Sequence, residues 1–158
     1  MNLPIEKILK EKGVAYRLIP LSQEAYTVND VIRYSRENID PDDVCKTIIL
    51  RSRKSDRRIA VFLRGNDKLD FSKLKKILGE EMAIADREQV KEVSGVEPGA
   101  VCPFLLSCPL FVDNNVVALK RINCGSGQHL FGLEFEREDL AKGAQYELVD
   151  LSKLMPTE

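Results

Sequence analysis

The sequence predicts an α+β fold in which a mixed, largely antiparallel curved sheet, or an open barrel, is flanked by helices. Strand-like segments outnumber helical ones, and short turns join most of them, which favours this arrangement over a doubly wound parallel sheet. The chain has 158 residues, of which 44% are hydrophobic and 31% are charged. Such values are typical of a globular protein, so we expect a single domain over residues 1–158.

The N-terminal region is predicted to alternate between helix and strand. Asn2 is a suitable N-cap for a short amphipathic helix that ends near Gly13. Residues 14–20 alternate in polarity and finish at a proline, as a strand does. Thr27 is followed three residues later by an aspartate, so we expect it to begin a second helix that runs toward Asn38.

The middle of the chain is predicted to contain a β-hairpin followed by shorter elements. Two β-rich runs, 44–52 and 58–64, are separated by a charged turn and are expected to pair antiparallel. Three elements follow in chain order: a helix capped by Ser72 and ended by Gly79, a brief strand over 82–85, and a helix from Asp86 through Val93.

The last third begins with the longest predicted loop. Glycine and proline interrupt residues 94–109 at short intervals, so regular structure is not expected there. Regular patterns then resume, and they predict strands over 110–113, 116–123 and 129–134, a helix over 137–142 and a closing strand over 146–149.

Composition excludes several classes of protein. No apolar run approaches the roughly 18 residues of a membrane-spanning helix, and the N-terminus is charged where a signal peptide is apolar. We therefore expect a cytoplasmic protein with no membrane partner. The four cysteines form no CxxC pair and are expected to be free thiols, with disulfides as the alternative. The oligomeric state does not follow from the sequence.

Charge is unevenly distributed along the chain. The window 46–76 holds eleven Lys or Arg and three Asp, a balance of 11 − 3 = +8, although the whole chain carries −1. One interpretation is a surface that faces a polyanion. The other is ordinary solvated charge on strands and turns.

Lys46 is the first candidate functional residue, because both faces of its predicted strand are mainly apolar. A lysine drawn toward the interior needs a partner or loses its proton, so Lys46 points to an anionic ligand or a cleft. The alternative is that it lies at the strand end and extends its ammonium into solvent.

Two glycine-containing loops are further candidates. The segment from Gly95 to Phe104 combines flexible and locked backbone positions, which suits a wall that approaches a ligand through main-chain N–H groups. Gly125, Ser126 and Gly127 lie between two apolar strands. One hypothesis is that they form an anion-binding nest with a hydroxyl. Plain turns are the structural alternative for both loops.

His129, the only histidine, could orient a water molecule or a ligand, or it could be structural. Two sharper hypotheses use it: a metal site with Cys102, Cys108 and Cys124, and a nucleophile–base pair with Cys102. The cysteine spacings match none of the usual zinc patterns. Phosphate-loop, dinucleotide-binding, zinc-protease and serine-hydrolase motifs are also absent.

Several motifs occur together in a characteristic order. They are VCKTIIL (44–50), SGVEPGAVCPF (94–104), LFVDNNV (110–116) and NCGSGQHLFGLEFEREDLAK (123–142). In this order the chain resembles the YbaK and prolyl-tRNA-synthetase-associated domain family. The resemblance implies a curved mixed sheet with surrounding helices, and an editing domain that hydrolyses the ester of a wrongly charged aminoacyl-tRNA.

The resemblance also implies roles for individual residues. Lys46 would hold the phosphate or backbone of the terminal adenosine, and the loop from Gly99 to Pro103 would shape the aminoacyl pocket. Gly125 and Ser126 would line its other side, and the neighbouring ribose hydroxyl would assist the attacking water. We expect these five residues to be catalytic, and a second set to bind substrate: Gly95, Ala100, Val101, Cys102, Phe104 and His129.

Two departures from the family pattern concern the pocket. Leu105-Leu106 stands where many relatives carry glycine, and Cys102 stands where small hydroxyl residues or proline are frequent.

The leading hypothesis is a trans-editing deacylase without metal or cofactor, acting for example on alanyl- or cysteinyl-tRNA for proline. Its partners would be the aminoacylated 3′ end of tRNA and, in some settings, an aminoacyl-tRNA synthetase. The alternatives are a noncatalytic tRNA- or nucleotide-binding module and a metal-dependent hydrolase.

Overall fold

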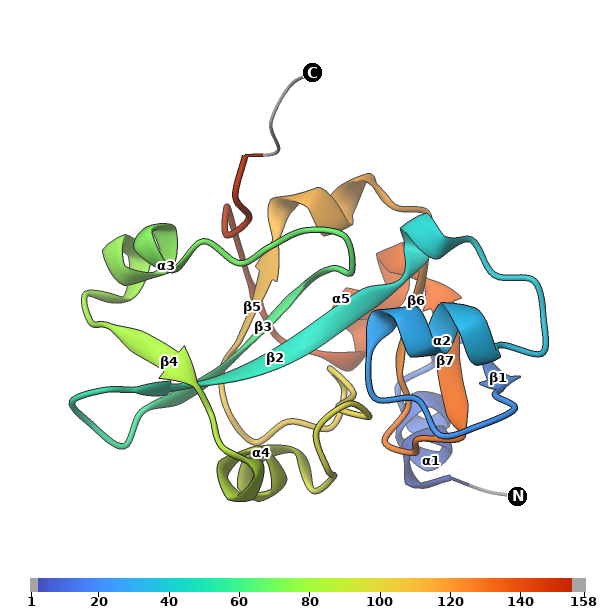
Figure 1. Cartoon of the computed structure of the whole chain (residues 1–158). Helices are drawn as coiled ribbons and strands as arrows, with labels where there is room; N and C mark the ends of the chain where they lie inside the picture. Colours follow the sequence, from blue (N-terminus) through green and yellow to red (C-terminus); the bar gives the residue numbers. More distant parts are fainter. Residues whose placement is uncertain (1–2, 155–158) are drawn as a thin grey trace.

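The computed structural model describes residues 3–154 and contains both helices and strands (Figure 1). The helices of this part of the chain are α1 Pro4–Glu11, α2 Val28–Tyr34, α3 Phe71–Leu78, α4 Arg87–Ser94 and α5 Leu140–Gly143, with 3-10 turns at Pro41–Asp43, Asn114–Ala118 and Arg137–Asp139. The strands are β1 Tyr16–Pro20, β2 Cys45–Ser52, β3 Arg58–Arg64, β4 Met82–Ile84, β5 Leu110–Asp113, β6 Arg121–Gly125, β7 Phe131–Glu136 and β8 Glu147–Val149. Within residues 3–154, no helix combines the length and apolar character needed to span a membrane.

The strands form two sheets that meet at one point. The smaller sheet has the order β1-β7-β6 and is antiparallel, whereas the larger has the order β4-β2-β3-β5-β8. In the larger sheet β2 pairs antiparallel with β3 and β4, and β5 lies parallel to β3 and β8. A bridge between Val44 and Asn123 links the sheets. The prediction of a mixed α+β fold with an open curved sheet is therefore confirmed.

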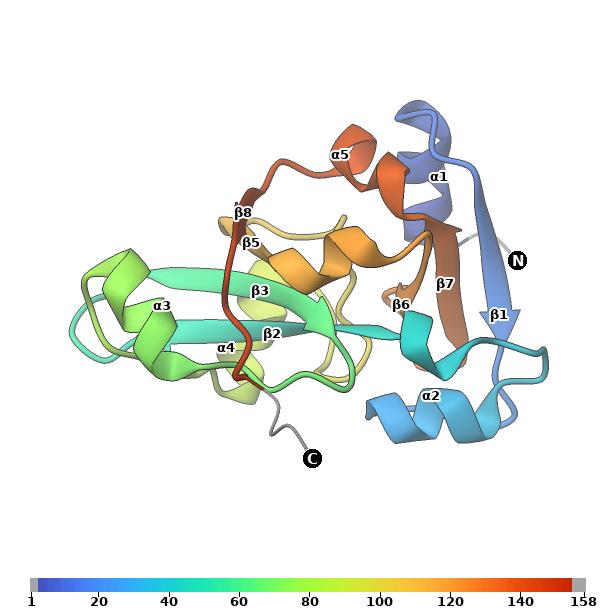
Figure 2. The ribbon, with the colours of Figure 1, turned by 90° about the horizontal axis from the view of Figure 1, so that it is seen from above.

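Helices cover both sheets from several sides. Viewed from above, α2 lies across one end of the strands of the smaller sheet, whereas α1 and α5 lie near the opposite end (Figure 2). One buried cluster fills the space between the sheets and includes Cys45, Ile49, Phe62, Ile122 and Leu133. A second lies on the other face of the larger sheet under α3, and includes Leu50, Val61 and Leu74. Alternation along β2 sends Lys46 to this second face, beside Ile48.

Local hydrogen bonds explain where several helices begin and end. Thr27 Oγ1 accepts from Asp30 N at 3.1 Å and starts α2, as predicted. Asp86 and Gln89 form a reciprocal capping box at the start of α4, and Gly95 closes that helix with a φ of 75°. The predicted cap Asn2 lies outside the described residues, and α1 begins at Pro4.

Four predicted boundaries are wrong, and three have a clear cause. Asp70, not Ser72, caps α3, because its Oδ1 accepts from Ser72 N and Lys73 N. The strand predicted over 116–123 begins only at Arg121, because Asp113 caps a 3-10 turn first. Helix α2 stops at Tyr34 instead of running toward Asn38, since the Ser35 side chain bonds to the backbone of Glu37. Strand β7 begins at Phe131 rather than at His129.

Candidate functional site

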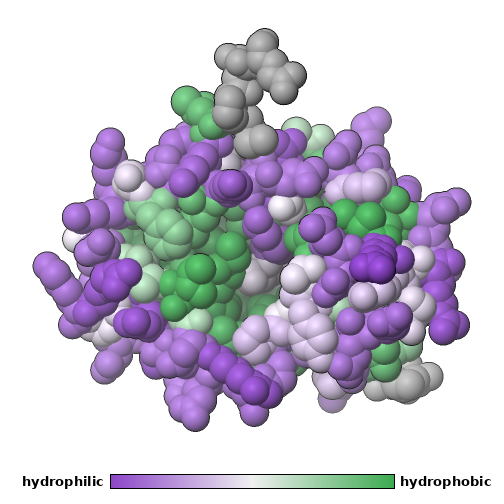
Figure 3. Space-filling view, in the orientation of Figure 1, coloured by the Kyte–Doolittle hydropathy of each residue, from purple (hydrophilic) through white to green (hydrophobic). Residues whose placement is uncertain are grey.

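A cavity of about 440 Å³ opens where the two sheets meet. Its walls come from the start of β2, from α2 and the loop before it, from residues 99–101, and from the facing ends of β6 and β7. Figure 3 shows a mostly polar rim on this face of the molecule and recessed apolar surface over β2, between α3 and β4. A cavity of this size is suited to a small ligand or to one part of a larger one.

An open strand edge forms part of the wall. Among the described residues, β4 pairs only with residues 50–52 of β2, and the bridge to β6 lies at Val44. Residues 46–48 therefore have no neighbouring strand on that side, and all three line the cavity. Because successive residues of a strand direct main-chain groups alternately to its two edges, this segment offers backbone hydrogen-bonding groups to a ligand.

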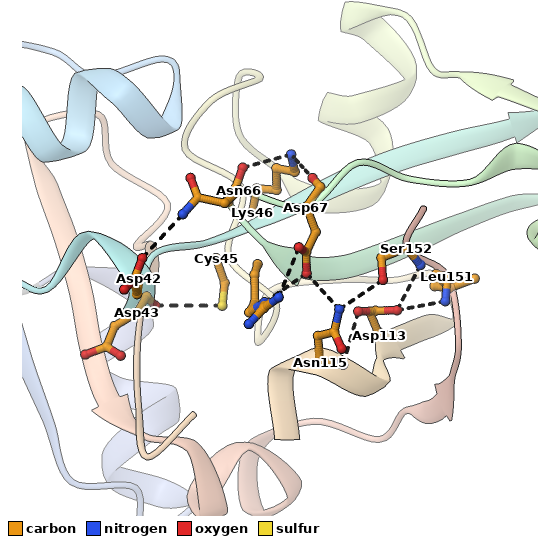
Figure 4. Close-up of polar contacts among 12 residues, drawn as sticks. Asp42, Asp43, Cys45, Lys46, Asn66, Asp67, Asp113, Asn115, Leu151 and Ser152 are labelled. Carbon is orange, nitrogen blue, oxygen red and sulfur yellow. Dashed lines mark hydrogen bonds and ion pairs between the residues drawn. The ribbon is translucent and has the colours of Figure 1, made fainter. Parts of the chain in front are cut away.

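Lys46 is anchored at the cavity through main-chain oxygens. Its Nζ donates to Asp67 O at 2.7 Å and to Gly65 O at 3.2 Å (Figure 4). Burial lowers the pKa of Lys46, the charge of Asp67 partly offsets this effect, and Lys68 adds to it. Within residues 3–154 no carboxylate oxygen forms an ion pair with Lys46, so its positive charge is available to an anion.

The loop that anchors Lys46 is itself fixed by a buried carboxylate. The Asp67 side chain is only 3% exposed and accepts two bonds from Arg64, at 2.8 and 3.1 Å, and one from Asn115 at 3.1 Å. Burial raises the pKa of Asp67, but these hydrogen bonds and the Arg64 charge outweigh burial and hold it below its usual value. Sequence reasoning missed this network, whose members come from distant parts of the chain.

The network continues into the C-terminal segment, as Figure 4 shows. Asn115 also donates to Ser152 Oγ at 3.0 Å, and Asp113 Oδ1 accepts from the backbone N of Leu151 at 2.7 Å and of Ser152 at 3.0 Å. The position of the Lys46 ammonium therefore depends on contacts that reach across the larger sheet.

Glycines bring the other walls together by allowing close backbone approach. A Cβ at Gly99 would lie 2.8 Å from Tyr26 Cα, and its φ of 98° also disfavours other residues. A Cβ at Gly125 would overlap Val101 O. Gly127 N donates to Ala100 O at 2.8 Å. Three segments distant in sequence are thereby held against one another at the cavity.

The structure brings six of the eleven candidate site residues to the cavity. They are Lys46, Gly99, Ala100, Val101, Gly125 and His129. The other five take different positions. Gly95 ends α4, and Cys102 is fully buried in the core. Pro103 and Phe104 line a second, separate cavity. Ser126 is buried, with Oγ 2.6 Å from Phe131 O, and it closes the turn between β6 and β7.

Tyr26 was not singled out from the sequence, yet it lines the cavity beside His129. The two ring centroids are 4.5 Å apart, with the planes inclined by 36°. His129 Nε2 lies 3.0 Å from Pro98 O, which fixes the imidazole against the loop. Tyr26 immediately precedes the Thr27 cap, but nothing local shows that it faces residues about a hundred positions away.

The cysteines behave as buried thiols. Burial raises the pKa of Cys45 to about 12 and also raises those of Cys108 and Cys124. All four cysteines are free. Among residues 3–154, no three His, Cys, Asp or Glu side chains gather as a metal site. Besides main-chain groups, the residues that line the cavity offer one lysine, hydroxyls, side-chain amides and an imidazole.

Together these features define a small α+β domain whose cavity is built from glycine-dependent backbone and one lysine. The family model of the aminoacyl-tRNA editing domain matches residues 22–142, a range that contains every residue lining the cavity except Leu21. The chain belongs to this aminoacyl-tRNA editing domain family.

Similar proteins agree with this assignment. Over 133 residues the chain is 35% identical to a proline–tRNA ligase of Caldicellulosiruptor saccharolyticus, and the match covers 80% of this chain and 23% of the ligase. This chain therefore spans about a quarter of that relative's length.

Two solved structures share the fold. The hypothetical protein APE2540 has a TM-score of 0.83 at 24% identity, covering 94% of this chain and 99% of that one. A protein proposed to be a trans-editing enzyme for prolyl tRNA synthetase has a TM-score of 0.81 at 16% identity, covering 97% and 99%.

Proposed function

We propose that this protein is an aminoacyl-tRNA deacylase that acts in trans and hydrolyses the ester at the 3′ end of mischarged tRNA. The observation that carries the proposal is the cavity of an editing-domain family member. In it, a lysine that forms no ion pair with a carboxylate of residues 3–154 stands beside walls of closely packed main chain. An aminoacylated RNA 3′ end supplies both a phosphate anion for the lysine and an ester that the main-chain walls can hold.

The cavity suits ester hydrolysis by a positioned water. Among the described residues that line it there is no aspartate or glutamate, and its two cysteines are buried as thiols. An activated ester needs a water molecule in place, hydrogen-bond donors for the developing oxyanion and an acceptor for one proton. The proposed donors are the backbone N–H groups of Gly99, Val101 and Gly125, because that of Ala100 already donates to Glu97 O. The ribose hydroxyl beside the ester is the proposed aid to proton transfer.

Lys46 is proposed to bind a phosphate of the terminal nucleotide. Its ammonium keeps hydrogen-bonding capacity because two carbonyls occupy two of its three protons. Lys68 lies close enough to affect its pKa, and both belong to the basic window 46–76. We propose that this window follows the tRNA backbone outside the cavity.

The deacylation of a panel of mischarged tRNAs tests the proposal. The panel should include alanyl- and cysteinyl-tRNA for proline, and the rate of ester loss should be compared with that of protein-free solution. We expect at least one ester to be cleaved well above background, and Lys46→Ala to reduce the rate by about a hundredfold, as for loss of a charged contact. Lys142→Ala, a charge that pairs with Asp139 away from the cavity, is the matched control. Background rates for every ester would refute the enzyme assignment.

The absence of a carboxylate among the described cavity residues also favours a second candidate, a noncatalytic module that binds an RNA end or a nucleotide. In that case the protein would bind uncharged tRNA with an affinity that falls as salt rises, and it would cleave none of the esters. The match to a proline–tRNA ligase makes a synthetase a candidate partner under either function.

A further inference from the structure

Tyr26 is unusual among the exposed apolar side chains, because it is both exposed and held in place. It is 53% exposed at the cavity. Its backbone N donates to Asp30 Oδ2 at 3.0 Å, and its hydroxyl donates to Glu24. Gly99 packs against its Cα, as described above. A single exposed aromatic side chain is common on protein surfaces. One that is fixed by contacts of its backbone and its hydroxyl loses less conformational entropy when a ligand binds to it.

His129 supports the Tyr26 ring from the β6–β7 turn. The centroid distance of 4.5 Å lies within the range of aromatic pairs, and the imidazole is tied in turn to Pro98 O. The two rings thus form an aromatic ledge, defined here as Tyr26 and His129, at the rim of the cavity. The deeper walls are different in character, since Ala100 and Val101 are only 2% and 7% exposed.

We propose that the aromatic ledge binds the terminal base of the RNA 3′ end by stacking on Tyr26. This inference rests on the proposed function. A base has an aromatic face that stacks on tyrosine regardless of its identity, whereas a small aminoacyl group fits the enclosed walls better than the open rim. With the base on Tyr26 and a phosphate at Lys46, two contacts from different elements orient the ester above residues 99–101.

The test compares two substrates and two substitutions. The substrates are an aminoacyl-tRNA that the wild-type protein cleaves, and the same aminoacyl-tRNA with an abasic 3′-terminal nucleotide. Tyr26→Ser removes the ring, and Tyr26→Phe keeps it. Tyr34→Ser is the matched control, because Tyr34 ends the helix that begins just after Tyr26 and does not line the cavity.

On the intact substrate we expect Tyr26→Ser to lower kcat/KM about tenfold, mainly through KM. Tyr26→Phe and Tyr34→Ser should stay within about twofold of the wild type. On the abasic substrate the wild-type protein should lose about tenfold, and Tyr26→Ser should add no further loss, because both changes remove the same contact. Thermal unfolding of each variant checks that folding is unchanged.

Equal losses for Tyr26→Ser on the intact and abasic substrates would overturn the proposal, and would assign Tyr26 to the amino acid, to a protein partner or to the fold. A loss for Tyr26→Phe equal to that for Tyr26→Ser would also overturn it. If the wild-type protein cleaves no ester, the deacylase assignment fails. The affinity for uncharged tRNA then tests whether the terminal base stacks on Tyr26. In that case uncharged tRNA should bind about tenfold more tightly than its abasic form to the wild type, and equally to Tyr26→Ser.

Discussion

Single residues at the cavity have roles that depend on very local geometry. Gly99 and Gly79 both have positive φ values, 98° and 77°, but only Gly99 has neighbouring atoms where a Cβ would stand. The same substitution at the two positions therefore separates backbone strain from steric overlap.

We expect Gly99→Ala to lower the free energy of unfolding by about 3 kcal/mol, because it combines strain with a clash against Tyr26. Gly79→Ala should cost only about 1 kcal/mol, since nothing lies within 4 Å. Urea unfolding followed by circular dichroism measures both. Equal costs would show that the contact between Gly99 and Tyr26 does not constrain the cavity wall.

The lowered pKa of Asp67 in the folded protein makes the free energy of unfolding depend on pH. Its folded pKa lies below the usual value of 3.8, so its hydrogen bonds stabilise the protein above about pH 4 and are lost as the pH falls through the folded pKa. Asp67→Asn should therefore be less stable than the wild type at pH 7, and the difference should shrink at pH values well below 4. Asp56→Asn, at an exposed turn, is the control and should show no such convergence in urea unfolding.

At the scale of elements, the caps decide where helices begin. Asp70 accepts two backbone hydrogen bonds at the start of α3, whereas Ser72 lies within the helix. We expect Asp70→Ala to cost about 1 kcal/mol in thermal or urea unfolding. Ser72→Ala should change stability by less than about 0.5 kcal/mol. The reverse order of effects would contradict the cap seen here.

The same example shows what could be predicted from the sequence. Helices with apolar residues at helical spacing and a glycine at the end were placed correctly, because those signals are local. Asp70 and Ser72 are both good caps two positions apart, and the local pattern does not separate them. The strand predicted from Val116 failed because an apolar run does not reveal that Asp113 bends the chain first.

The site was predicted in part for similar reasons. Lys46 was recognised because a lysine in an apolar strand breaks the local pattern. Cys102 and Ser126 lie in equally promising motifs but face inward, and the direction of a side chain in an irregular loop is set by distant contacts. Tyr26 pairs with His129, and Asp67 receives a hydrogen bond from Asn115 besides those from nearby Arg64. His129 and Asn115 lie far along the chain from these residues, and one sequence does not identify such partners.

At the scale of the whole molecule, positive charge is concentrated in the window 46–76 of a chain whose net charge is −1. If the basic window 46–76 follows an RNA backbone, the logarithm of tRNA affinity should fall linearly with the logarithm of salt concentration. Lys68→Gln should reduce the magnitude of that slope by about one, because one phosphate contact is lost. Lys142→Gln should leave it unchanged. Filter binding at several salt concentrations gives the slopes, and identical slopes for all three proteins would exclude Lys68 from the RNA-binding surface.

Stability is also distributed unevenly. Helix α2 contributes Val28, Asn29 and Val31 to the cavity, yet none of its side chains is fully buried. Strands β2 and β3, on the facing side, hold many of the buried side chains. Because opening a segment costs roughly what its buried contacts contribute, α2 can detach at a much smaller cost than the sheets.

Native-state hydrogen exchange should therefore show faster exchange for the amides of α2 than for those of β2 and β3, and a bound RNA end should slow α2 selectively. If α2 exchanges faster, one wall of the cavity is less protected than the sheets, and a bulky polymer end would enter by local opening of that wall while the sheets stay folded.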